Sequence, residues 1–177
     1  MHAFVDESVR DQRYLLSAAL VDPSDLARLR KVLRALLLAG QRELHFKKEK
    51  PPRRRQLADR IVAAGATITV YTAGCRHGDE AARQRCLQQL AHDLIKTRAH
   101  RLVLEGREDR DVIDARTLRT TLGPQPSLGG LTYEHVESTQ EPLLWIPDAL
   151  GWCYGAGGDW RRRVACAINK VIDCDQR

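Results

Sequence analysis

The sequence lacks any C-x-x-C pair, although it contains five cysteines. Their number is odd and their spacing irregular, so neither a zinc site nor a disulfide framework is expected. Reduced thiols fit a cytoplasmic protein, which is the location we predict. The cysteines are Cys75, Cys86, Cys153, Cys166 and Cys174.

Long apolar runs are also missing. No stretch approaches the length of about 18 apolar residues that a membrane-spanning helix needs, and "LRALLLAG" is too short. Two acids, at positions 6 and 7, precede any apolar stretch of useful length, so no signal peptide is predicted. We therefore expect no membrane partner.

Several catalytic fingerprints are absent as well. The chain has no P-loop and no dinucleotide-binding glycine motif, which argues against nucleotide hydrolysis and hydride transfer. It has no G-x-S-x-G motif and no order of residues that indicates a serine triad.

What the chain does have is positive charge. The net charge is +6, from 29 basic and 23 acidic residues, and most of the basic residues are arginines. Arginine favours bidentate contacts with phosphate, so nucleic acid is a plausible partner. A GC-rich genome produces the same bias, so the charge alone supports this partner only modestly.

The pattern of elements predicts an α/β fold. A hairpin of two strands opens the chain, and β-α alternation follows, so we expect a central mixed sheet of about five strands with helices on both faces. The 177 residues form one domain, 1–177, in this prediction. Val164, Ile168, Val171 and Ile172 have helical spacing, so residues 159–177 are predicted to form a C-terminal helix packed on the domain.

Four acids occupy informative positions on these elements. Asp6 is predicted to close the first strand and Glu105 to close the buried strand "RLVLEG". Asp148 stands in the first turn of the helix "IPDALGWCYG", and Glu43 begins the charged segment "RELHFKKEK". If the two strands are neighbours, Asp6 and Glu105 lie at the same edge, where a helix start can bring Asp148. Each acid also has an ordinary explanation, such as a solvated turn or the helix dipole.

Clustered carboxylates repel one another unless a cation lies among them. Hard oxygen ligands suit Mg²⁺ or Mn²⁺, and two such ions about 4 Å apart can activate water in phosphodiester hydrolysis. The predicted metal ligands are Asp6, Glu105 and Asp148, with Glu43 completing the catalytic set.

Four short stretches give the chain a family resemblance: "FVDES", "ELHFKK", the strand that ends in Glu105, and "STQEPLLWIPDALGW". Together they resemble the domain-of-unknown-function 3800 family, which is grouped with the RNase H-like fold. The resemblance implies that Asp6, Glu43, Glu105 and Asp148 match the acidic positions of a metal site.

It also implies accessory roles for Glu7 and Lys47. Two departures from the family pattern are Val9, where members typically carry glycine, and Pro147, where they often carry a small residue. Neither departure removes a carboxylate.

The basic cluster at 47–55 adjoins the predicted site and suits sequence-independent phosphate contacts. Its candidate phosphate-positioning residues are Lys47, Lys48, Arg53 and Arg54. The roles of His45 and His135 stay open, since a lone histidine on a strand is more often structural. Trp145, Trp152 and Trp160 could stack on bases, although Trp152 fits a core position better.

We therefore predict a nuclease that depends on Mg²⁺ or Mn²⁺ and acts on RNA, DNA or a hybrid. The alternative is a non-catalytic nucleic-acid- or partner-binding module on the same fold. An unrelated α/β phosphoesterase is a third reading, which would separate Asp148 from Asp6. The sequence leaves the oligomeric state open, a homodimer included.

Overall fold

The computed structural model describes residues 1–106, 111–122 and 130–175. Six strands form one sheet in the order β5-β4-β1-β2-β3-β6. The strands are β1 (His2–Arg10), β2 (Arg13–Val21), β3 (Ile68–Gly74), β4 (Arg101–Glu105), β5 (Thr132–Val136) and β6 (Ile168–Asp173). β1, β2 and β3 pair antiparallel, whereas β4, β5 and β6 each pair parallel to a neighbour, so the sheet is mixed as predicted.

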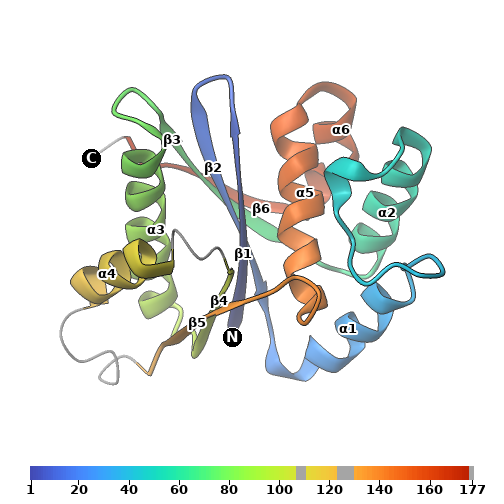
Figure 1. Cartoon of the computed structure of the whole chain (residues 1–177), viewed down its shortest axis with the longest axis horizontal. Coiled ribbons are helices and arrows are strands. Elements are labelled where there is room, and N and C mark those ends of the chain that lie inside the picture. The colour runs from blue at the N-terminus through green and yellow to red at the C-terminus, as the bar shows by residue number, and fades with distance from the viewer. Residues whose placement is uncertain (107–110, 123–129, 176–177) are drawn as a thin grey trace.

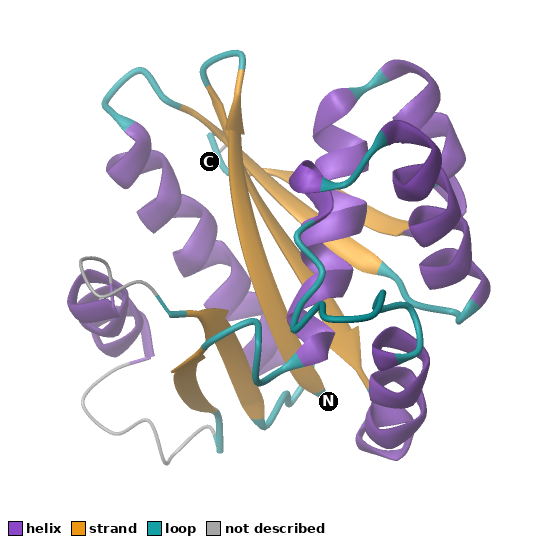
Figure 2. Cartoon of the chain, turned by 45° about the vertical axis from the view of Figure 1, so that its right-hand side comes forward, coloured by secondary structure: helices purple, strands orange, loops and turns teal. Residues whose placement is uncertain are grey.

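Helices cover both faces of this sheet (Figure 1; Figure 2). α3 and α4 lie on one face, and the remaining four helices lie on the other. The helices are α1 (Leu26–Arg34), α2 (Pro51–Ala63), α3 (Asp79–Lys96), α4 (Asp111–Leu122), α5 (Trp145–Ala156) and α6 (Gly158–Arg163). None of the helices in the described ranges is both long and apolar enough to cross a membrane.

Alternation along β1 divides the apolar residues between two cores. Phe4 packs with α2 and α5 on one face, while Ala3 and Val5 pack with α3 on the other. This is the consequence of the period of two in a strand, whose successive side chains point to opposite faces. The same alternation decides which acids of β1 face which helices.

Within the described residues, the predicted helix over 159–177 is wrong after Arg163, and its last two positions, 176 and 177, lie outside those residues. α6 ends at Arg163, and Ile168–Asp173 forms the edge strand β6. The register with β3 jumps from Ile68↔Ile168 to Thr69↔Lys170, so Asn169 is an extra, bulged residue. The bulge changes the parity of the strand, and Ile168 and Ile172 consequently pack on opposite faces. The apolar residues of this bulged strand therefore have a spacing in the sequence that is also typical of a helix.

The sequence also placed the end of the first strand too early. β1 continues past Asp6 to Arg10 and pairs with β2 along its whole length. The pattern of elements also predicts a short strand around Leu44, but the only regular part of this segment is a 3-10 turn at Phe46–Lys48.

Candidate active site

Asp6 and Glu105 occupy equivalent positions on adjacent parallel strands. The paired register of β1 and β4 runs to Val5↔Leu104, and the two acids are the next residue on each strand. Phe4 and Val103, two residues earlier, both pack in the core beneath α5, so the acids share the α5 face. The structure therefore meets the condition on which the predicted pairing of these acids depended.

The third acid reaches this face because α5 packs close to the sheet. Gly151 lies against β2, where a Cβ atom would overlap Oγ of Ser17. Ser17 is the register partner of Asp6. Asp148 precedes Gly151 by one helical turn on the same side of α5 and so comes to the same region of the sheet.

A cavity of about 520 Å³ lies at this junction. Asp6, Glu105 and Asp148 all contribute to its lining. Leu44, His45 and Lys47 line it from the segment before α2, and Ser138 lines it from the segment before α5. The cavity therefore joins strands of the sheet to α5 and to the segments that precede α2 and α5.

Asp148 has the most informative electrostatics of the three. Burial raises the pKa of its carboxyl group to about 6, and the charges of Glu105 and Glu43 act in the same direction. The backbone N–H of Phe46, which donates to Oδ2 of Asp148 at 3.0 Å, and the nearby His45 act in the opposite direction. The acids thus repel one another at this site, which is the condition that a cation relieves.

Carboxylate oxygens are the donors that Mg²⁺ and Mn²⁺ prefer, so the chemistry of these residues fits a hard divalent ion. Within residues 1–106, 111–122 and 130–175, however, no three Asp, Glu, His or Cys side chains converge closely enough to hold an ion as they lie. The acids share one cavity but not one point.

Glu43 lies beside the cavity rather than in its lining. Its carboxylate accepts a hydrogen bond from the hydroxyl of Ser138. The carbonyl of Ser138 in turn accepts from the indole N–H of Trp145 at 2.9 Å. Glu43 therefore holds the segment before α5 and acts on Asp148 through its charge.

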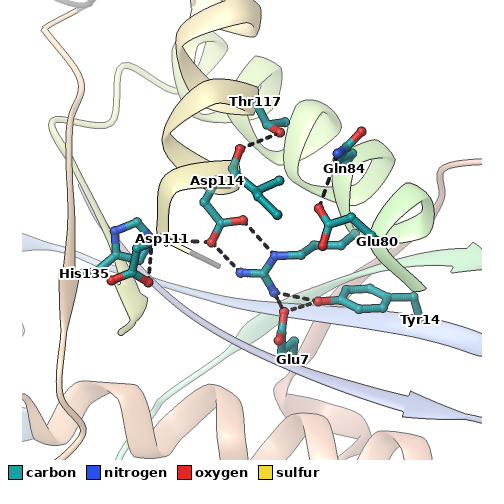
Figure 3. Close-up of polar contacts among 10 residues, drawn as sticks. Glu7, Tyr14, Glu80, Gln84, Asp111, Asp114, Thr117 and His135 are labelled. Carbon is teal, nitrogen blue, oxygen red and sulfur yellow. Dashed lines mark hydrogen bonds and ion pairs between the residues drawn. The ribbon is translucent and has the colours of Figure 1, made fainter. Parts of the chain in front are cut away.

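Glu7 follows the alternation to the opposite face of the sheet. There its carboxylate pairs with Arg83 of α3 and accepts from the hydroxyl of Tyr14 (Figure 3). Arg83 is buried and also makes two hydrogen bonds to Asp114 of α4. The predicted accessory residue Glu7 is thus part of a buried ion-pair network, although it also borders the cavity.

His135 belongs to the same network. Its Nε2 atom lies 3.4 Å from Asp114 and 3.6 Å from Asp111 (Figure 3). Burial raises the pKa of Asp114, but hydrogen bonds from Arg83 and His135 outweigh it and hold the pKa below its ordinary value. This contact places His135 against α4, whereas His45 lines the cavity.

The predicted phosphate-positioning residues separate into two groups. Lys47 lines the cavity, and Lys48 is exposed next to it. Arg54 lies over the ring of Trp152, which also lines the cavity. Arg53 instead uses both terminal nitrogens of its guanidinium within the protein, donating to Gln56 and to the carbonyl of Leu36. Within the described part of the chain, Arg54 donates only through Nε, to the carbonyl of Glu49 at 2.7 Å.

Sequence reasoning missed several residues around the site. Arg10 was not among the predicted site residues, but it ends β1 and lines the cavity. Ser17 and Arg83 carried no motif, and their roles come from strand register and from contacts between distant elements. A first strand that continues beyond Asp6 would place Glu7 on the opposite, buried face of the sheet. A buried carboxylate there needs a cationic partner, and this is the one signal in the sequence that could have indicated the network.

Comparisons with known proteins bear on the fold. No family model matches the chain, and no curated protein matches it. Among solved structures, it matches RNase HII in "Structure of the PCNA:RNase HII complex from Archaeoglobus fulgidus". The TM-score is 0.54 with 19% identity, over 86% of this chain and 70% of that chain. The chain has an RNase H-like fold. Its mixed sheet with helices on both faces is the α/β architecture that the sequence predicted.

Proposed function

We propose that the chain is a divalent-metal-dependent nuclease that hydrolyses phosphodiester bonds of RNA or DNA. The observation that carries the proposal is the meeting of Asp6, Glu105 and Asp148 at one cavity of an RNase H-like sheet. These acids come from β1, β4 and α5, and nothing in the packing of a core requires three carboxylates there. The resemblance to the domain-of-unknown-function 3800 family is part of this proposal.

Asp6, Glu105 and Asp148 would hold Mg²⁺ or Mn²⁺, with Glu43 supporting the site from behind Ser138. When bound, such ions supply an activated water and stabilise charge on the leaving oxygen. Lys47 lies on the cavity wall, where its ammonium group can contact a phosphate. No nucleophilic side chain is needed, and RNA, DNA and hybrids all carry the required phosphodiester.

The second candidate is a nucleic-acid-binding module that does not cleave. It is favoured by the acids' failure to converge on one point in the described part of the chain. It predicts nucleic-acid binding that is independent of metal and of Asp6.

Calorimetric titration with Mn²⁺ or Mg²⁺ separates the two candidates. We expect the wild-type protein to bind the ion and Asp6→Asn to lose at least tenfold in affinity, because a charged ligand becomes neutral. Asp11→Asn, in the turn after β1, is the matched control and should bind as the wild type does. Cleavage of labelled RNA and DNA then follows with the same proteins. A wild-type protein that binds no ion, with or without nucleic acid, contradicts the nuclease.

A further inference from the structure

A group of arginines near the cavity is held by aromatic rings instead of by acids. Arg10 and Arg54 lie over the ring of Trp152, with their Cζ atoms 4.9 and 4.6 Å from its centroid. Nε of Arg54 also donates to the backbone carbonyl of Glu49, which is uncharged and leaves the positive charge of Arg54 unneutralised. Arg55 lies over Trp160 at 5.6 Å. Such cation–π contacts orient a guanidinium without neutralising its charge.

The rings themselves are packed together. Trp152 lies 5.4 Å from Phe46 and 5.3 Å from Trp160, measured between ring centroids. Phe46 is fully buried, so the pair of tryptophans is fixed on the core. Arg10 belongs to β1, and the other arginines and both tryptophans belong to α2, α5 and α6. These three helices lie side by side (Figure 1; Figure 2).

These three arginines are among the described arginines that have no acidic partner. Among the described residues, no carboxylate forms an ion pair with any of them. The arginines that do pair with Asp or Glu are Arg13, Arg28, Arg30, Arg83, Arg85, Arg101, Arg162 and Arg163. The charges of Arg10, Arg54 and Arg55 therefore remain available to an external anion.

Their position relative to the acids indicates what that anion is. Arg10 and Trp152 line the same cavity as Asp6, Glu105 and Asp148, while Arg54 and Arg55 extend from Trp152 over α2. The cations thus begin at the cavity and lead away from it. A single small anion would need only one such group, whereas a row of separated cations fits a chain of phosphates.

We propose that Arg10, Arg54 and Arg55, which we call the arginine track, bind the phosphate backbone of a nucleic acid where it leaves the cavity. This inference rests on the proposed function for the substrate and adds its path across the protein. Two guanidinium groups so close to Trp152 leave little room for a base, so the ring positions arginines and does not read sequence. Binding at the track is therefore independent of base sequence.

Arg54→Gln/Arg55→Gln tests the track without altering the cavity lining. The probes are a fluorescent single-stranded DNA of mixed sequence and its duplex, measured by anisotropy at several salt concentrations in EDTA to prevent cleavage. We expect weaker binding and a shallower dependence of log K on log salt. The slope should fall by about 0.9 per lost contact for a duplex and about 0.7 for a single strand.

Two further variants isolate the cause. Arg116→Gln/Arg119→Gln removes the same charge from exposed positions of α4, on the other face of the sheet, and should leave the slope close to that of the wild type. Arg54→Lys/Arg55→Lys keeps the charge but loses the planar group, and should recover most of the slope. Circular dichroism confirms that each protein is folded.

The outcomes separate this inference from the nuclease. An equal fall in slope for the α4 variant, or no fall for the track variant, overturns the track and leaves the nuclease standing. A track that behaves as expected in a protein that binds no metal supports the track and contradicts the nuclease. A wild-type protein that binds neither probe at low salt overturns both.

Discussion

The carboxyl group of Asp148 lies where burial and two neighbouring acids oppose its ionisation. Its pKa rises from 3.8 to about 6. Between these values the folded protein binds more protons than the unfolded chain does, so stability falls as the pH rises through this window. At neutral pH the ionised carboxylate of Asp148 therefore lowers the free energy of unfolding of the metal-free protein, and a bound cation would reduce this loss.

Asp148→Asn tests this cost directly. The amide keeps an oxygen that can accept from the backbone N–H of Phe46 but removes the charge. We expect the free energy of unfolding of the metal-free protein to rise by about 1–3 kcal/mol at about pH 8 and to be unchanged near pH 3.5. Urea denaturation at both pH values measures the difference.

Asp159→Asn, at an exposed acid of α6, is the control and should show no such dependence on pH. A stabilisation of Asp148→Asn that is equal at both pH values would contradict an ionisation effect. The same variant should bind Mn²⁺ more weakly than the wild type, so stability and metal affinity change in opposite directions.

At the scale of elements, the close approach of α5 to the sheet positions Asp148. Gly151 permits this approach because it has no Cβ atom to meet Ser17. Gly155, one turn later, has the same role, since a Cβ there would lie 2.9 Å from Leu15 Cδ1. The register of β1 and β2 places Ser17, and with it the contact to Gly151, directly beside Asp6.

We expect Gly151→Ala to lower the free energy of unfolding by about 1–3 kcal/mol, because the added methyl group forces α5 away from β2. The affinity for Mn²⁺ should fall as well, since Asp148 moves with the helix. Ser17→Gly/Gly151→Ala should recover much of both losses. Gly106→Ala, where a Cβ would meet only ordinary contacts at 3.8 Å and beyond, is the matched control. A Gly151→Ala protein as stable as that control would show that the helix is not held by this contact.

The elements that sequence predicted best are those with strong local signals. The proline at position 51 and the glycine at position 65 predict a helix between them, and α2 covers Pro51–Ala63. The neighbouring positions of Asp6 and Glu105 were predicted only on the condition that their strands are adjacent, and the pairing of β1 with β4 meets that condition. By contrast, β6 depends on a bulge at Asn169, and the extension of β1 depends on pairing with β2. Neither feature can be recognised in a local sequence pattern. For the candidate site, the catalytic roles of the acids stay predictions.

At the scale of the whole molecule, the network around Arg83 joins elements from every third of the chain. Glu7 comes from β1, Asp114 from α4 and His135 from β5, and all contact one another through Arg83 or Asp114 (Figure 3). The network lies on the face opposite the candidate site, one residue from Asp6. It could not be predicted from sequence, because its members are far apart along the chain and share no motif.

Removing the cation of this network should therefore destabilise the entire domain. Arg83→Met leaves Glu7 and Asp114 buried without their shared partner, which we expect to cost about 3–5 kcal/mol in the free energy of unfolding. Arg85→Met, two residues later on α3, breaks a half-exposed pair with Asp175 and should cost about 1 kcal/mol or less. Urea denaturation at neutral pH compares the two variants.

Near-equal losses would mean that the network is no more important than a surface ion pair. A large loss for Arg83→Met that Glu7→Gln/Asp114→Asn in the same chain largely restores would show that the uncompensated carboxylates, and not the missing side-chain volume, cause it.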